Sequence, residues 1–201
     1  SVASMEYKGR FICDRADCIK QFENNLYDAI IASYSLYFFP HLIKDIARIL
    51  KPDGVFIAIT HSQFSLQEVL HLIPESMQNA GLKPIEKTTI ARLFEAFSLE
   101  NGREKLAPHF GRIDEIVYEN VLRFSPDEIQ DCIDYLEKKK FLLFKDVAER
   151  HPQNLEQVKT GFYNCLHNHT QAKGEILLTK DDVIFHCFNP GIINGREENP
   201  A

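Results

Sequence analysis

Two nearly continuous apolar segments flank one amphipathic segment in the first third of the chain. Residues 29–34 (AIIASY) and 55–59 (VFIAI) have the length and composition of strands that are buried on both faces. Between them, residues 41–50 carry apolar side chains at helical spacing, and the turn at residues 51–54 (KPDG) ends that helix. A strand, a helix and a strand in this order predict a βαβ unit with two parallel strands.

Helical periodicity returns at residues 65–79 and, more briefly, at residues 98–108. A strong helix start follows at residues 125–128 (SPDE), because the serine can cap the helix, the proline suits its first position and the glutamate completes a capping box. Another helix is predicted around residues 155–166. Together the later helices form a predicted helical insertion in an α/β fold.

Further segments have the pattern of strands. Residues 10–13 form a short apolar run, and residues 113–124 alternate well enough for a strand. Residues 175–179 and 183–187 are two apolar runs on either side of a polar pair, Asp181 and Asp182. This last arrangement predicts a C-terminal antiparallel hairpin.

Composition narrows the class of protein. The 201 residues are 44% hydrophobic and 26% charged, with a net charge of -6. This apolar content is enough for a core, and the acidic balance disfavours nucleic-acid binding. We expect no membrane association, because the longest apolar stretch, residues 29–39, is too short and too polar to span a bilayer. Residues 1–10 also lack the apolar region of a signal peptide.

The five cysteines are odd in number and scattered, which favours a reducing, cytoplasmic setting over a disulfide framework. Cysteine and histidine meet at residues 165–169 (CLHNH), but no second half with zinc-ligand spacing follows. We therefore expect ordinary core and surface residues there, and no metal site.

Polar and aromatic side chains follow both predicted parallel strands. Ser33, Tyr34 and Tyr37 come after the first strand, and Thr60 and His61 end the second. In sheets of this kind ligands bind at the carboxyl ends of the strands, which makes these residues candidates for a binding site. The same hydroxyl groups can also satisfy backbone groups at strand ends, so a structural role stays open.

The chain resembles class I S-adenosylmethionine-dependent methyltransferases at residues 27–37 (YDAIIASYSLY) and 46–56 (IARILKPDGVF). These segments are similar to the family's fourth strand, the following helix and the fifth strand. Residues 97–106 and 179–185 also resemble the small-molecule branch of that family. Asp53 stands where the family usually has glycine, which still allows a turn.

The resemblance implies a Rossmann-like sheet, S-adenosylmethionine as the cofactor and methyl transfer to a small-molecule acceptor. By matching position, Asp17 would accept a hydrogen bond from the adenine amine, and the backbone of Cys18 would hold the edge of the ring. Ser33 and Tyr34 would contact the methionine part of the cofactor. Asp17 can equally be an ordinary turn residue.

On the acceptor side, the resemblance places Tyr37, His61 and Arg92 against the substrate, with His61 or Tyr37 as the catalytic base. A buried aromatic role for Tyr37 and a strand-end hydrogen bond for His61 are the structural alternatives. The segment at residues 97–110 and the helical insertion would form the lid that selects the acceptor.

Two features of the family are missing from this sequence: the glycine-rich loop after the first strand and the acidic residue after the second. No two of the nine glycines are separated by a single residue. We therefore expect a truncated chain that lacks the N-terminal βαβ portion and is not competent for methyl transfer alone. The expected divisions are a partial methyltransferase core (1–124), a helical insertion or lid (125–172), a hairpin that completes the sheet (173–189) and a loose tail (190–201).

The strand at residues 29–34 would then lie at an edge of the sheet. An unpaired edge beside apolar surface favours association, so we expect it to pair with residues 11–13, a second copy or a missing N-terminal segment. The alternative function is a catalytically inactive, methyltransferase-like interaction module. A nucleotide-binding domain of other chemistry is disfavoured because no phosphate-binding loop is present.

Overall fold

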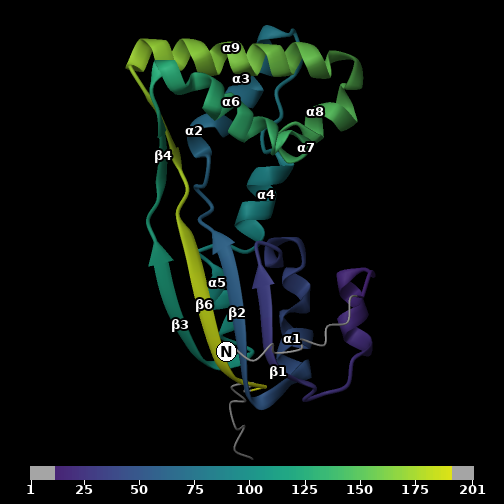
Figure 1. Ribbon diagram of the computed structural model, residues 1–201. Coiled ribbons are helices and arrows are strands. Elements are labelled where there is room, and N and C mark those ends of the chain that lie inside the picture. Colours follow the sequence, from purple (N-terminus) through teal and green to yellow (C-terminus); the bar gives the residue numbers. More distant parts are fainter. Residues whose placement is uncertain (1–11, 192–201) are drawn as a thin grey trace, which may run out of the picture.

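The computed structural model describes residues 12–191, which divide into two lobes with separate hydrophobic cores (Figure 1). The sheet lobe draws its core from residues 36–58, 97–113 and 183–187. The helical lobe draws its core from residues 66–94 and 132–178. The chain therefore crosses between the lobes four times, and the crossings bring distant segments together at the junction.

The sheet lobe contains a four-stranded sheet with the order β1-β2-β6-β3. Strands β1 (Tyr27–Ser33) and β2 (Leu50–His61) are parallel, and α1 (Ile43–Ile49) connects them. Strands β6 (Asp182–Pro190) and β3 (Phe110–Tyr118) continue the sheet in antiparallel pairs. The βαβ unit and the mixed α/β class predicted from the sequence are confirmed.

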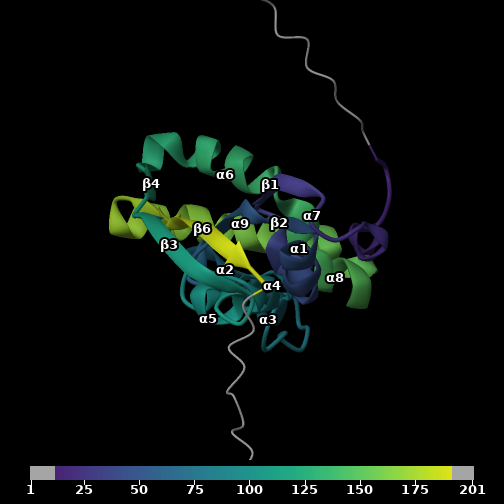
Figure 2. The same ribbon diagram turned by 90° about the horizontal axis from the view of Figure 1, so that it is seen from below.

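Within residues 12–191, helices cover one face of this sheet. Helix α1 and the short helix α5 (Gly102–Leu106) lie on the same side, as Figure 2 shows. They pack on Phe56 and Ala58 of β2 and on Phe185 of β6, which are fully buried. The apolar stripe of the predicted helix at residues 41–50 supplies this packing.

The other face carries five isoleucines, and we call it the open face. Register places Ile31 beside Ile57, and it places Ile184 of β6 between Ile59 of β2 and Ile116 of β3. Paired residues point to the same side of a sheet, so these side chains form one apolar surface. Ile31 is 65% exposed. The prediction that this strand is buried on both faces is wrong, because β1 lies at the edge and its outer face has no helix over it.

The predicted strand at residues 10–13 is also not found in its described part. Ile12 and Cys13 are outside any strand, and Arg10 and Phe11 lie outside the described residues. In residues 12–191, β1 pairs with β2 alone. Pairing of the β1 edge with another copy or another segment stays a prediction.

The helical lobe is built around the long helix α9 (Leu155–Lys173), which lies across the end of the molecule in Figure 1. Its other helices are α2 (Gln67–Leu70), α3 (Leu72–Asn79), α4 (Thr89–Ala96), α6 (Ile129–Glu137), α7 (Lys140–Leu143) and α8 (Lys145–Arg150). Short 3-10 helices are η1 (Ala16–Gln21), η2 (Leu36–Phe38), η3 (Pro40–Leu42), η4 (Pro126–Glu128) and η5 (Pro152–Asn154). No helix among the described residues is long and apolar enough to cross a bilayer.

The helix start predicted at residues 125–128 is confirmed, because Ser125 and Glu128 form the expected reciprocal capping box. The helix predicted around residues 155–166 is also confirmed and extends to Gly174, which ends it with a positive φ of 80°. The helix predicted at residues 65–79 is divided at His71 into α2 and α3.

The predicted C-terminal hairpin is wrong. Strand β5 (Ile176–Thr179) pairs with β4 (Val121–Phe124), whereas β6 pairs with β2 and β3. The polar residues between β5 and β6 do not turn the chain, since Lys180 donates its backbone N–H to the Asn120 carbonyl at 2.8 Å. Residues 176–190 therefore run beside residues 110–124 as one long interrupted ribbon that joins the two lobes. The strand predicted at residues 113–124 is divided between β3 and β4 for the same reason.

Candidate functional site

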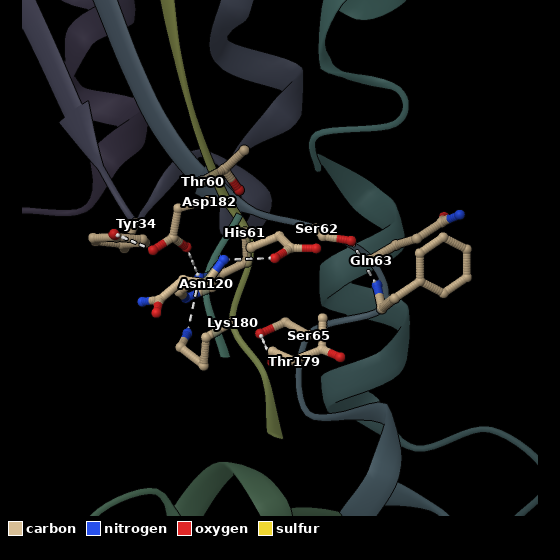
Figure 3. A network of polar contacts seen from close by, with 12 residues as sticks. Tyr34, Thr60, His61, Ser62, Gln63, Ser65, Asn120, Thr179, Lys180 and Asp182 are labelled. Atoms are coloured by element: carbon tan, nitrogen blue, oxygen red, sulfur yellow. Dashed lines mark hydrogen bonds and ion pairs between the residues drawn. The ribbon is translucent and has the colours of Figure 1, made fainter. Parts of the chain in front are cut away.

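His61 and Asp182 form the centre of a polar cluster at the junction of the lobes (Figure 3). His61 is the last residue of β2, Asp182 is the first residue of β6, and the two are cross-strand partners. Their side chains therefore point to the same side of the sheet. His61 Nδ1 lies 2.6 Å from Asp182 Oδ1, and the two side chains are 17% and 21% exposed.

This contact determines the tautomer of the imidazole. A carboxylate oxygen at 2.6 Å requires a proton on Nδ1, so neutral His61 has its lone pair on Nε2. Burial opposes ionisation of Asp182, but the hydrogen bond from His61 and the charge of Lys180 outweigh it and keep the pKa of Asp182 below its ordinary value. The pair is thus an anionic carboxylate that orients the imidazole through Nδ1.

Aromatic rings surround the imidazole. Tyr34 stacks on His61 with ring centroids 4.6 Å apart, and its hydroxyl donates to Asp182 Oδ2 at 3.1 Å. Phe94 of α4 meets the His61 ring edge-on at 5.6 Å, and Tyr37 lies 6.3 Å away. Tyr37 belongs to the core of the sheet lobe and Phe94 to the core of the helical lobe. The imidazole is therefore held between the two lobes.

Both tyrosines favour their protonated forms. Burial and the neighbouring Asp182 raise the pKa of Tyr34, and burial raises the pKa of Tyr37. At neutral pH each phenol is therefore a hydrogen-bond donor rather than a base. Tyr34 also has a left-handed backbone, with φ of 48°, which places its ring over His61 directly after β1.

Lys180 brings a cation to the same cluster. Its Nζ lies 3.2 Å from His61 Nδ1, which cannot accept a hydrogen bond from the ammonium group while its own proton is directed at Asp182. Burial lowers the pKa of Lys180, and the attraction of Asp182 partly offsets this effect. The ammonium group balances the Asp182 carboxylate at a place where both are partly removed from water.

Hydrogen bonds between the crossing segments fix the backbone around the cluster. Thr60 is fully buried and its hydroxyl donates to the Phe97 carbonyl at 3.1 Å. Next to His61, the backbone N–H of Ser62 donates to the Asp181 carbonyl at 2.9 Å. The Asp181 side chain in turn accepts the backbone N–H of Asn120 at 2.9 Å. These contacts involve the chain segments at all four lobe crossings.

The candidate residues from the sequence fall in separate places. Tyr34, Tyr37 and His61 come together in the cluster. Ser33 is exposed at the end of β1, next to Tyr34 in the chain. Arg92 does not contact His61; it bonds to the Lys87 carbonyl, Thr89 and Asp146 in the helical lobe. Arg92 lies two positions from Phe94 on α4, which places the two side chains on nearly opposite sides of that helix.

Asp17 and Cys18 lie in η1, and both make hydrogen bonds with nearby groups of the chain rather than with residues of the His61 cluster. The Asp17 carboxylate pairs with Lys20 and approaches His41 at 3.3 Å. The backbone N–H of Cys18 donates to the Arg15 carbonyl at 2.9 Å, so it is not free for the edge of an adenine ring.

The assignment of Asp17, Cys18, Ser33 and Tyr34 to S-adenosylmethionine stays a prediction. The groups expected at the adenine are engaged in local contacts of η1. Four cavities of about 470, 230, 490 and 380 Å³ are bordered by other residues than Asp17, Cys18, Ser33 and Tyr34.

Sequence reasoning missed Asp182 and Lys180. Both belong to the polar segment at residues 180–182, which the sequence predicts to form a hairpin turn. Charged residues are common in turns, so they give no sign of a functional site. Their proximity to His61 follows from the β2–β6 register, which pairs residues 121 positions apart. No local pattern in the sequence carries that register.

No family model matches the chain, and no curated protein matches its sequence. Among solved structures, the chain is similar to a candidate sarcosine dimethylglycine methyltransferase from Galdieria sulphuraria, with 16% identity over 84% of this chain and 56% of that one and a TM-score of 0.35. It is also similar to phosphoethanolamine N-methyltransferase 2 of Haemonchus contortus in complex with S-adenosyl-L-methionine, with 16% identity, 84% and 34% coverage and a TM-score of 0.37. The YcgJ protein of Bacillus subtilis gives 12% identity, 85% and 67% coverage and a TM-score of 0.40. The chain thus spans 56% and 34% of the first two structures.

Proposed function

We propose that this chain is the acceptor-side portion of a class I S-adenosylmethionine-dependent methyltransferase that acts on a small molecule. The observation that carries the proposal is the His61–Asp182 pair, with Nδ1 and Oδ1 2.6 Å apart at the carboxyl end of β2. The sequence motifs at residues 27–37 and 46–56, which form β1, α1 and the start of β2, support it.

Within this proposal His61 is the base and Asp182 is its positioning residue. Asp182 holds the Nδ1–H tautomer, so Nε2 is available to take the proton of an acceptor hydroxyl or amine. Tyr37 is the weaker choice of base because burial raises the pKa of its phenol. S-adenosylmethionine would supply the methyl group, and the rest of its site would come from outside the described residues.

The aromatic rings would contribute by positioning and by excluding water. Tyr34, Tyr37 and Phe94 have ring centroids 4.6, 6.3 and 5.6 Å from that of the imidazole. Methyl transfer depends largely on alignment of the two reactants and on a dry site. We also propose a cytoplasmic setting, which suits the five free cysteines of the chain.

Two measurements test the proposal. Calorimetry with S-adenosylhomocysteine should show no tight binding by this 201-residue chain, and tight binding would contradict the claim that the cofactor site is incomplete. In the full-length gene product, transfer of labelled methyl from S-adenosylmethionine to small amines and alcohols should be lost in His61→Gln. It should persist in His167→Gln, a matched change at an exposed position of α9. Equal rates in the two variants would remove His61 from the mechanism.

The open face favours a second candidate function, the catalytically inactive interaction module. Ile31 is 65% exposed and is continuous with Ile57 on β2, and the β1 edge beside it is unpaired in residues 12–191. Apolar surface next to a free strand edge is typical of protein interfaces. Self-association or partner binding through residues 29–34 is the form this function would take. A stable complex together with no methyl transfer by the full-length gene product would favour it over catalysis.

A further inference from the structure

A cavity of about 470 Å³ in the helical lobe is lined mainly by basic side chains, and we call it the basic pocket. It lies where the segment that leads into α4 meets the C-terminal end of α8. Its lining residues are Lys83, Pro84, Ile85, Glu86, Lys87, Arg92, Arg150 and His151.

The charge of this pocket contrasts with that of the whole chain. Lys83, Lys87, Arg92 and Arg150 are four permanent cations around one cavity, with Glu86 as the acidic lining residue. The chain as a whole has a net charge of -6. Two further carboxylates lie at the cations, because Glu95 pairs with Lys87 and Asp146 pairs with Arg92. One positive charge remains after all three acids are counted, so an anion is the ligand that this pocket favours.

Arg92 is held in a fixed orientation within the pocket. Its Nη1 donates to the Lys87 carbonyl at 2.8 Å, and its Nη2 donates to Thr89 Oγ1 at 3.0 Å and to Asp146 Oδ1 at 3.1 Å. A guanidinium group has five N–H donors, so two remain for a ligand. A donor group that is already oriented loses little side-chain entropy when it binds.

The Asp146 carboxylate is the acidic partner that helps to fix the Arg92 guanidinium group. It is 4% exposed and also accepts the backbone N–H and the hydroxyl of Thr89, at 2.5 and 2.9 Å. Burial opposes its ionisation, but the bonds from Thr89 and the charges of Arg92 and Arg150 outweigh this and keep the pKa of Asp146 below its ordinary value. Asp146 is therefore engaged with its own neighbours rather than facing a ligand.

We propose that the basic pocket binds the phosphate group of a small organic phosphate. The excess of positive charge around this cavity suits the negative charge of a phosphate group, and the two Arg92 N–H groups that remain can each donate to a phosphate oxygen. Ile85 is buried in the pocket wall next to Pro84, and these two residues give an organic group an apolar contact. The volume is sufficient for a small phosphorylated molecule.

This site is separate from the His61 cluster. Arg92 and Phe94 lie on nearly opposite sides of α4, so the helix stands between the pocket and the imidazole. The proposal therefore does not depend on methyl transfer, and it is tested by binding alone.

Calorimetry of the 201-residue chain at low salt with inorganic phosphate, phenyl phosphate and benzoate tests the proposal. We expect saturable binding of both phosphates, tighter for phenyl phosphate and absent for benzoate. The double variant Lys83→Gln, Arg150→Gln should weaken phenyl phosphate binding by about tenfold or more, because it removes two charge-assisted contacts. Both changes leave the Arg92–Asp146 contact in place.

The matched control is Lys105→Gln, Lys138→Gln, which makes the same change in net charge at exposed positions outside the pocket. It should leave the affinity within about twofold of the wild-type value. Equal weakening by the two double variants would mean a general charge effect and would overturn the proposal. Benzoate binding as tight as that of phenyl phosphate would overturn the choice of phosphate. Binding to vesicles that contain phosphatidic acid, without binding of either soluble phosphate, would overturn the choice of a small ligand.

Discussion

His61 and Asp182 are 121 positions apart in the chain and meet with Nδ1 and Oδ1 separated by 2.6 Å. Both residues lie at strand ends where the sheet lobe joins the helical lobe, and their pairing is part of the β2–β6 ladder. The register of that ladder thus sets the orientation of the imidazole. A substitution at Asp182 that keeps the β2–β6 pairing but removes the negative charge distinguishes the chemical role of the carboxylate from its role in the fold.

Asp182→Asn is that change. The amide has the shape of the carboxylate but no charge, and it can hold His61 in the opposite tautomer. If His61 is the base, methyl transfer by the full-length gene product should fall by about 10²–10⁴-fold. The initial rate with labelled S-adenosylmethionine measures this loss, and circular dichroism checks the fold. Asp131→Asn, an exposed position on α6, is the control. A rate in Asp182→Asn as high as in the control would contradict the role of the pair.

Gly102 shows how closely the covered face of the sheet is packed. A Cβ atom at residue 102 would lie 2.5 Å from Cε2 and Cζ of Phe185, a fully buried ring in the core of the sheet lobe. Gly102→Ala should therefore lower the free energy of unfolding by about 1–3 kcal/mol. Urea denaturation followed by circular dichroism measures this effect.

Gly161→Ala is the matched comparison. Gly161 lies inside α9, and a Cβ atom there would meet Ser76 at 3.5 Å, an ordinary contact distance. Alanine is the better helix former, so this change should raise the free energy of unfolding by about 0.5–1 kcal/mol. If both variants shift stability in the same direction, the packing at one of the two positions differs from the structure described.

The parts of the fold that follow from local patterns could be predicted from the sequence. The βαβ unit has strands and a helix of distinct periodicity, and the capping box at Ser125 and Glu128 is a local hydrogen-bond arrangement. The ribbon of residues 176–190 with residues 110–124 could not be predicted, because the Lys180–Asp182 break resembles a turn. The strands that pair with β6, which are β2 and β3, are determined by packing between segments far apart in the sequence.

The residues of the candidate site also fall into two groups: those that a local pattern predicts and those that depend on contacts between distant segments. Tyr34, Tyr37 and His61 follow or end strands that the sequence identifies, and they do come together. Asp182 depends on the β6 register and therefore could not be found. The resemblance predicts Arg92 at the acceptor. In α4, however, Arg92 and Phe94 are two positions apart and lie on nearly opposite sides of the helix, so Arg92 lines the basic pocket while Phe94 contacts His61.

Asp146 gives the stability of the chain a dependence on acid. Because its pKa is lowered in the folded state, the stabilisation is fully present above the ordinary value of 3.8 and is lost as pH falls through the lower folded value. Asp146→Asn should lower the free energy of unfolding by about 2–4 kcal/mol at pH 7. The difference from wild type should shrink below about pH 4. Urea denaturation of both proteins at pH 7, 5 and 3 measures it, and a constant difference would contradict the assignment.

Ile31→Lys tests whether the open face associates. The side chain is 65% exposed in the middle of β1, so a lysine there should be tolerated by the fold while it places a charge on the apolar surface. A charged residue at a strand edge opposes pairing with another chain. Light scattering over a range of concentrations should show association of the wild-type chain and its loss in Ile31→Lys.

Phe141→Lys separates the open face from general surface hydrophobicity. Phe141 is 85% exposed on α7 in the helical lobe, so the change removes a larger apolar side chain at a distance from β1 and adds the same charge. Association should persist in this variant. If both variants lose it equally, reduced hydrophobicity or added charge explains the effect. A wild-type chain that stays monomeric throughout would show that the open face does not bind a second copy, and would leave a different partner as the occupant that the interaction module requires.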